Sequence, residues 1–504
     1  MAKKFSRRDF LSVAALATVG SVLAACKPQV VKETVVVEKP VEKVVTKVVK
    51  ETVVVEKPVE KVVTKVVEKE KVVTKVVKET VVVEKRPKMR VLHRREYFKE
   101  MEILFEKAVK QWAKENNVDV EVSTVGAEAF QDFVAKMVAA VQAGNPPDLV
   151  YHIRLVQQLY FLDALEPVSD VVDRAQKLYG DVPYLQKLLN YIDGEWWGIP
   201  FMVHGGGQFA RKDIFEGNGI DPFEMETYDQ RRDGCLKVSD PDKEMYGWGI
   251  TVNRSGDGSG FIAGIIHNWG GHITDKEMTK LTFNSPETVA AVEWLTEIYT
   301  ADKWAPMLPP GIMSWTDSSN NEAYLAGKIA YTHNAASVYA KAKADKNPVF
   351  EKTVVLPEAI GPLGKRLSGS SGGQFNIPKG AKNIQLAKGL ALYMLQPDVF
   401  IPISLTSAGL FLPSYAKYYE MDKVKKAFEK DPNLERMGKS AMGDYPGLSW
   451  PADPSPFFDA ISAQTILTDM MAQTITQGVK PADAVKQAAD RMAQIAEEMG
   501  VFKK

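Results

Sequence analysis

The chain of 504 residues contains only two cysteines, Cys26 and Cys235. At most one disulfide is therefore available, so stability has to come from a buried core. The chain also lacks net charge, with 64 Lys and Arg against 64 Asp and Glu. This balance produces no overall field that would attract nucleic acid, and no nucleic-acid partner is expected.

Patterns of common catalytic sites are missing as well. The chain has no Gly-x-Ser-x-Gly, no HExxH and no CxxC, and its six histidines are scattered. The Gly-rich stretch RSGDGSGF lacks the Gly-Lys-Ser/Thr of a phosphate-binding loop and is interpreted as a mobile loop. We therefore expect no enzyme activity, no cofactor and no metal.

Long apolar runs are also absent from the N-terminus. The apolar residues from Leu11 to Ala25 would form a helix shorter than the ~30 Å core of a bilayer. A short apolar segment behind a basic start is typical of an export signal. Arg7-Arg8 resembles a twin-arginine signal, and the LAAC that ends at Cys26 resembles a lipobox. Residues 1–25 are thus predicted to be a signal peptide and Cys26 to be lipidated; the alternative is a chance match within a signal anchor.

Residues 26–88 are dominated by a Val/Lys/Glu repeat. The sequence KETVVVEKPVEKVVTKVV fills 32–49 and recurs unchanged in 50–67. Because 18 residues make five helical turns, a Val-faced coiled coil is one interpretation. Pro40, Pro58 and the low helix propensity of Val argue against it. The favoured interpretation is an extended or partly ordered, lipid-anchored tether, since the repeat has no Leu or aromatic residue to build a core.

After the repeat, the periodicity becomes that of an α/β protein. Strands are predicted at 89–92, 118–125 and 148–152, and helices at 98–116 and 129–144. Alternating strands and helices predict a parallel sheet with covering helices. Ligands bind beyond the carboxyl ends of the strands in such sheets, so the residues at those ends are candidates for a site.

Several longer motifs then follow in a fixed order, among them AAVQAGNPPDLVYH, DGEWWGIPF, FARKDIFEGNGIDP, NEAYLAGKIAYTHNAA and SGSSGGQFNIPKGAKN. As a set they resemble the extracellular solute-binding proteins of ABC importers. Among these they are most similar to the carbohydrate-binding branch, family 1, which is related to maltodextrin-binding proteins. The resemblance covers Met89 to Glu498. Where that branch has an acidic residue shortly after Ile-Pro, this chain has His204, so its sugar contacts are not simply inherited.

The resemblance implies an α/β, two-lobed fold of the periplasmic-binding-protein type (type II). Residues 89–203 and 369–418 would form the first lobe, and 204–368 and 419–504 the second. The segments that cross between lobes would absorb a hinge rotation when ligand closes the cleft.

Candidate ligand-binding residues follow from sugar chemistry. Aromatic rings stack on the C–H faces of a sugar, while polar side chains bind its hydroxyl groups. Loop tryptophans, polar residues at strand ends and residues near the crossings are therefore selected. The expected ligand-binding residues are Arg94, Arg95, Tyr151, His152, Phe201, His204, Trp269, Trp315, Asn334, Gln374 and Trp450.

The expected function is capture of a sugar or oligosaccharide and its delivery to the membrane permease subunits of an ABC importer. The protein would act outside the cytoplasm as a monomer, lipid-anchored to the outer face of the cell membrane. Arg94 and Arg95 leave open an acidic sugar, a sugar phosphate or another non-sugar solute. An anchored carbohydrate-active enzyme and a structural lipoprotein with a degenerate site are further alternatives.

Overall fold

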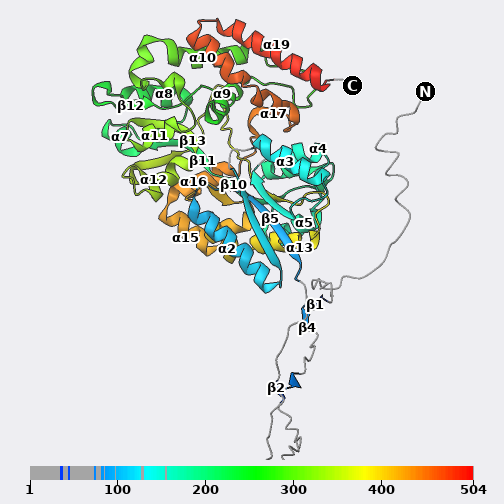
Figure 1. Ribbon diagram of the computed structural model, residues 1–504. Coiled ribbons are helices and arrows are strands. Elements are labelled where there is room, and N and C mark those ends of the chain that lie inside the picture. The colour runs from blue at the N-terminus through cyan, green and yellow to red at the C-terminus, as the bar shows by residue number, and fades with distance from the viewer. Residues whose placement is uncertain are drawn as a thin grey trace, which may run out of the picture. The chain divides into compact units, whose positions relative to one another are not determined.

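The computed structural model describes residues 35–37, 44–45, 73–74, 81–83, 86–96, 98–126, 130–153 and 156–502 (Figure 1). The chain divides into two compact units, Met1–Pro87 and Lys88–Lys504. The predicted signal peptide and Cys26 lie outside the described residues. Within the described ranges, no helix is both long and apolar enough to span a bilayer.

In the first unit, the described parts of the repeat are short strands. β1 (Val35–Val37) pairs antiparallel with β4 (Val81–Val83), and β2 (Val44–Val45) pairs antiparallel with β3 (Val73–Thr74). Val favours this extended conformation because its branched side chain suits a pleated surface. The role of the repeat as a tether stays a prediction.

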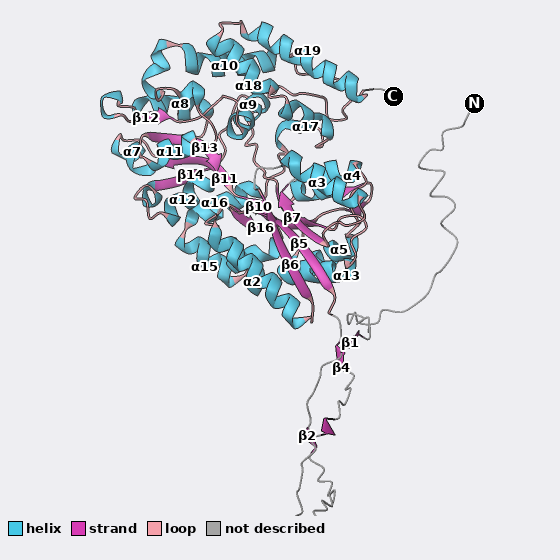
Figure 2. Ribbon diagram, viewed as in Figure 1, coloured by secondary structure: helices cyan, strands magenta, loops and turns pink. Residues whose placement is uncertain are grey.

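The second unit is built on two sheets, which Figure 2 shows in magenta. The larger sheet has six strands in the order β16-β10-β15-β7-β5-β6. Its members are β5 (Lys88–Arg94), β6 (Asp119–Val125), β7 (Leu149–Ile153), β10 (Ile199–His204), β15 (Gly372–Asn376) and β16 (Phe411–Pro413). β5 pairs parallel with both β6 and β7, which confirms the three predicted strands and their parallel arrangement.

Helices cover both faces of this sheet. The two predicted helices are confirmed as α2 (Lys99–Glu115) and α3 (Phe130–Gln142). α2 places Phe105, Val109 and Trp112 in the larger core, although Ile103 of the same helix is 54% exposed. The remaining helices that belong to this sheet are α4 (Val156–Phe161), α5 (Ser169–Tyr179), α6 (Tyr184–Asn190), α13 (Ile384–Met394) and α14 (Pro397–Thr406). A two-stranded hairpin of β8 (Tyr191–Ile192) and β9 (Glu195–Trp196) lies beside them.

The smaller sheet has four strands in the order β12-β13-β11-β14. They are β11 (Gly206–Arg211), β12 (Tyr246–Trp248), β13 (Ile329–Ala335) and β14 (Thr353–Leu356). One face carries a second core of buried apolar side chains, to which the C-terminal helices contribute. Figure 1 shows α19 (Pro481–Met499) along α10 (Pro286–Thr300), with which it is in contact.

The other helices of this half complete its layers. They are α7 (Lys212–Gly217), α8 (Tyr228–Lys237), α9 (Gly256–Asn268), α11 (Ser319–Leu325), α12 (Ser337–Ala344), α16 (Pro432–Ala441), α17 (Pro456–Ala463) and α18 (Ile466–Thr476), whereas α15 (Asp422–Lys430) packs Val424 and Phe428 into the larger core. α16 contacts β11 and β14 of the smaller sheet, whereas α15 contacts α14 beside the larger one. The predicted lobe boundaries stay a prediction.

The passage from β10 to β11 joins the two sheets through a single residue, Gly205. Its N–H donates to the carbonyl oxygen of Leu410 at 3.0 Å, and its own carbonyl accepts from the N–H of Ala336 at 3.0 Å. A Cβ atom at position 205 would collide with the carbonyl oxygen of Gly409. The crossing therefore depends on a close approach of backbones that only glycine permits.

We expect Gly205→Ala to destabilise the protein by about 1–3 kcal/mol, because the added methyl group must displace backbone rather than a flexible side chain. Thermal unfolding followed by circular dichroism measures the effect. Gly217→Ala is the matched control, since a Cβ there meets no atom within 4 Å. Equal unfolding midpoints for the two variants would show that the crossing tolerates a side chain.

Candidate functional site

The larger sheet brings several predicted residues together at the carboxyl ends of β5 and β10. Arg94 ends β5, and its guanidinium lies 5.8 Å from the centre of the Phe411 ring. The ring of His204, at the end of β10, lies 5.2 Å from the same Phe411 ring. Arg94 and His204 thus meet on one aromatic residue, directly beside the crossing at Gly205.

The charge of Arg94 is balanced inside the protein. Its Nε lies 3.6 Å from Oε1 of Glu96, and both side chains are buried. Burial raises the pKa of Glu96 to about 7, and the opposing effect of the Arg94 charge is smaller. The Tyr151 hydroxyl faces the Glu96 carboxylate and opposes the rise in its pKa, and among the described residues Nη1 of Arg94 has no hydrogen-bond partner. Removing these two groups from water costs free energy that their mutual attraction offsets only in part. A hydroxyl group of a ligand could supply a further hydrogen bond to the pair.

Arg95 points to a different environment. It is exposed and lines a pocket of about 580 Å³ between α2 and the edge strand β6. Charges of both signs surround this pocket. Its lining residues are Arg95, Glu96, Lys99, Glu102, Glu106, Val122, Ser123 and Thr124.

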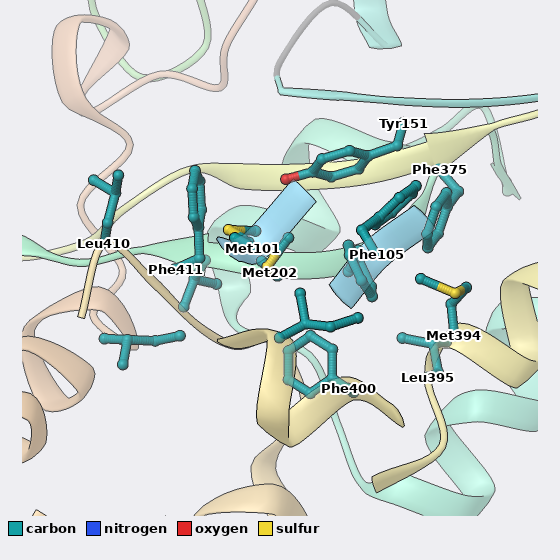
Figure 3. Packing of buried hydrophobic residues seen from close by; sticks show 14 of the residues in the cluster. Met101, Phe105, Tyr151, Met202, Phe375, Met394, Leu395, Phe400, Leu410 and Phe411 are labelled. Atoms are coloured by element: carbon teal, nitrogen blue, oxygen red, sulfur yellow. The ribbon is translucent and has the colours of Figure 1, made fainter. Parts of the chain in front are cut away.

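Two predicted aromatic contacts are wrong for this structure. Tyr151 and Phe201 have no exposed surface and belong to the larger core. Figure 3 shows Tyr151 among Phe105 and Phe375, and the ring centres of Phe201 and Phe375 are 4.5 Å apart. Successive side chains of a strand point to opposite faces of the sheet. Tyr151 and Phe201 are on the face that is covered by helices, so they point into the core rather than toward a ligand.

His152 and Gln374 are neighbours but are also covered. They are opposite each other in the β7–β15 register. Both are buried, and the His152 ring stacks on Phe133 with centres 4.3 Å apart. Burial lowers the pKa of His152 to about 4, so the ring is neutral at physiological pH. In this conformation neither side chain offers a surface to a ligand.

On the smaller sheet, Asn334 and Trp315 lie in a polar region. Asn334 is near the end of β13, where Ala335 pairs with Gly206 at the crossing. Its Nδ2 donates to Oδ1 of Asn321 at 2.6 Å. The main-chain carbonyl of Trp315 accepts from Oγ1 of Thr251 at 3.2 Å, and the Trp315 side chain is partly buried.

The sequence interpretation missed the N-terminus of α9 in this region. The stretch interpreted as a mobile loop contains Ser255, whose Oγ caps α9 by accepting from the N–H of Gly258 at 2.9 Å. The carboxylate of Asp317 accepts from the N–H groups of Gly256 and Asp257. Burial raises the pKa of Asp257 to about 6. A Ser followed by Gly and Asp is a helix-start signal that could have indicated this cap.

Trp269 was also predicted to contact ligand, and the structure places it elsewhere. It follows α9 and packs against Trp294 and Tyr228, with ring centres at 4.9 and 5.9 Å. These partners belong to α10 and α8, in the helix layer of the smaller sheet. Its ring packs on that layer and stays partly exposed, and a ligand contact of Trp269 stays a prediction.

Trp450 lies in a loop that packs against α9, since its ring centre is 5.6 Å from that of His267. Its ring centre is 4.8 Å from that of His272. Tyr184 of α6 is 52% exposed. Partial burial is the main cause that raises its pKa, and the negative charges of Asp453 and Asp444 raise it further. The charges of the loop that carries Trp450 thus act on Tyr184, which sequence reasoning missed because Tyr184 opens an ordinary amphipathic helix.

The arrangement offers polar and aromatic groups for binding. Among the residues that the structure describes, no cluster of three or more His, Cys, Asp or Glu side chains could hold a metal. Beside the crossing at Gly205, β10 and β16 bring His204 and Phe411 together, and the end of β13 brings Asn334 alongside. Two α/β halves joined by such strands form a two-lobed architecture.

The family is defined by sequence as well. Residues 107–435 match the model of the bacterial extracellular solute-binding proteins. The chain belongs to this family. No curated protein matches the chain.

Solved structures of other solute-binding proteins share the fold. A solute-binding protein of an ABC transporter from Thermotoga lettingae, bound with alpha-D-tagatose, is 20% identical with a TM-score of 0.65 and covers 81% of this chain and 99% of that one. Maltose-bound MalE3 from T. maritima is 18% identical with a TM-score of 0.67, covering 81% and 99%. A protein from Agrobacterium vitis with bound D-mannitol is 19% identical with a TM-score of 0.62, covering 82% and 99%. At these identities the likeness establishes the fold alone.

The raised pKa of Glu96 gives a pH prediction. Because the folded protein holds the proton more tightly than the unfolded chain, this residue contributes stability below about pH 4.5 that is lost as pH rises through about 7. Relative to Glu96→Gln, the wild type should lose roughly 1–3 kcal/mol between pH 4.5 and pH 8. Urea unfolding across this range measures the difference, and parallel pH profiles would contradict the assigned burial of the charge.

Proposed function

We propose that this protein binds a sugar or an oligosaccharide between its two lobes and delivers it to the permease of an ABC importer. Its family supports this proposal, as do the sugars and the sugar alcohol bound by the proteins of the same fold. The observation that carries it is that His204 and Phe411 of the larger sheet and the end of β13 of the smaller sheet lie together beside the crossing at Gly205. Hinge closure around a solute needs this arrangement.

In this proposal Trp450, Tyr184 and Trp315 supply apolar faces for stacking on the sugar rings. His204, which is only partly buried, binds hydroxyl groups, since a neutral imidazole can both donate and accept a hydrogen bond. These side chains lie on both sides of the crossing. A ligand that touches both would favour the closed form over the open one.

The Arg94–Glu96 pair favours a neutral ligand. Above about pH 7, where Glu96 is ionised, its charge 3.6 Å away offsets that of the buried guanidinium and leaves Arg94 little attraction for a second anion. An acidic solute is the second candidate, because Arg95 is exposed beside a charged pocket. That pocket also holds three glutamates, which would oppose an anion.

Titration calorimetry on the full chain tests the ligand class. At pH 8 we expect maltose to bind and glucuronate to bind at least tenfold more weakly, because the ionised Glu96 carboxylate then cancels the arginine charge. Tighter binding of glucuronate, lost in Arg95→Ala, would establish the acidic alternative instead.

The aromatic contacts are tested by truncation. Trp450→Ala and Tyr184→Ala should each weaken maltose binding by about tenfold, since a stacked aromatic contributes about 1 kcal/mol or more. Trp269→Ala is the matched control: it should lower the unfolding temperature while leaving the affinity unchanged. Loss of affinity in Trp269→Ala alone would place the ligand on the other side of the smaller sheet.

We further propose that Cys26 is acylated and that the repeat tethers the binding unit to the outer face of the membrane. The LAAC motif and the basic, apolar N-terminus support this proposal. A single acyl chain binds membranes weakly, and a lipoprotein anchor therefore needs more than one chain.

Cys26→Ala should move the protein from the membrane fraction to the soluble fraction and abolish incorporation of labelled palmitate. Cys235→Ala is the matched control, because Cys235 is a buried free thiol in the second unit. Membrane retention of Cys26→Ala would point to an uncleaved signal anchor.

A further inference from the structure

The loop Gly443–Asp453, here called the Trp450 loop, contacts one of the segments that cross between the sheets. The N–H of Tyr445 donates to the carbonyl oxygen of Ser368 at 3.0 Å. Side chains have no room at this contact. A Cβ on Gly369 would collide with the backbone of Tyr445, and one on Gly443 with the backbone of Ser368.

The segment that this loop contacts leads from one sheet to the other. Ser368 follows β14 of the smaller sheet, and β15 of the larger sheet begins at Gly372. β15 is a central strand, paired with β10 on one side and β7 on the other. Any movement of residues 368–371 relative to the Trp450 loop is therefore a movement at the crossing.

His267 holds the loop from the other side. It lies on α9, is 1% exposed, and its Nδ1 is hydrogen-bonded to the hydroxyl of Tyr445 at 2.6 Å. Its ring centre is 5.6 Å from that of Trp450, and the ring of His272 completes the contact with Trp450. One buried imidazole thus contacts both the residue that reaches the crossing and the tryptophan that the proposed function assigns to ligand.

We propose that His267 is a positioning residue: through Tyr445 it fixes the Trp450 loop against Ser368 and so couples the orientation of the Trp450 ring to the crossing segment. This proposal rests on the proposed function for the role of Trp450 in binding. The coupling itself depends only on the contacts of His267, Tyr445 and Ser368. The role of Trp450 in ligand binding and the coupling through His267 can therefore be tested independently of each other.

The groups around His267 favour its neutral form. Burial, followed by the charge of His272, lowers the pKa of His267 to about 3. The pKa of His272 is also lowered, chiefly by burial, while Glu287 acts on it in the opposite direction. The pKa of Tyr445 is raised chiefly by burial and also by the negative charge of Glu358. Opening of the loop exposes His267 to water, so opening should become easier below the ordinary histidine pKa of about 6.5.

Amide hydrogen exchange of residues 368–372 in the full chain tests the coupling without any ligand. Tyr445→Phe, which removes only the hydroxyl, should speed this exchange about five- to tenfold, the loss expected for one hydrogen bond. His267→Leu should do the same, and His267→Gln, whose amide can still bond to the hydroxyl, should restore slow exchange. Tyr299→Phe is the matched control, since it removes a hydroxyl that donates to Ile250 in the same half of the molecule.

The pH profile separates a positioning role from a structural one. In the wild type, exchange corrected for its intrinsic rate should rise as pH falls below about 6.5, and this rise should be absent in His267→Gln. Unchanged exchange in both Tyr445→Phe and His267→Leu would overturn the coupling. Exchange that rises equally in Tyr299→Phe would also overturn it, because the effect would then be a general loss of stability.

Titration with maltose then tests the link to binding. Tyr445→Phe should weaken maltose binding several-fold, because the Trp450 ring is no longer held in place. If the wild type does not bind maltose while the exchange results hold, the proposed ligand is wrong and the coupling stands. If maltose binds equally to both while exchange differs, the coupling does not reach the site and the inference is overturned.

Discussion

The backbone contact at Gly205 is the constraint on which the rest of the structure depends. Its two hydrogen bonds, to Leu410 and from Ala336, bind the crossing to segments of both halves. Because glycine has no Cβ, β10 and β11 can follow each other directly and still lie against Gly409. The sheets are thereby placed so that the ends of β5 and β10 and the end of β13 lie beside the same crossing. The polar side chains that form the candidate site are together only for this reason.

Burial then decides which of these side chains can serve a ligand. Arg94 and Glu96 neutralise each other in the larger sheet, at a cost in desolvation that hydrogen bonds within the described residues do not fully offset. His152 is held neutral by burial against Phe133. His204, by contrast, is only partly buried and keeps a surface. The same sheet thus carries one internal ion pair and one accessible imidazole within reach of a single Phe411 ring.

The fold was largely predictable, and the site was predictable only in part. The first strands and helices of the second unit followed from apolar periodicity, because α2 and α3 each bury one face against the sheet. His204 and Asn334 were selected for their place at strand ends and lie beside the crossing at Gly205, while Trp450 was selected as a loop residue and lies in the loop that contacts Ser368. A ligand contact of Trp315 stays a prediction. Tyr151 and Phe201 were selected by the same reasoning and are core residues. A strand end places neighbouring side chains on opposite faces, and which face is covered depends on helices far away in the sequence.

The sequence by itself determined the class of protein: an α/β chain with an export-like N-terminus, a repetitive leader and the ordered motifs of a solute-binding family. Local properties suffice for this, since periodicity, glycine positions and motif order are all encoded within short windows. Only the tertiary structure decided that Glu96 lies beside Arg94, that Trp269 packs against Trp294 and that the charges of Asp444 and Asp453 act on Tyr184. Each of these brings together residues from two to more than two hundred positions apart through packing of the whole core, and depends on how much water that packing removes.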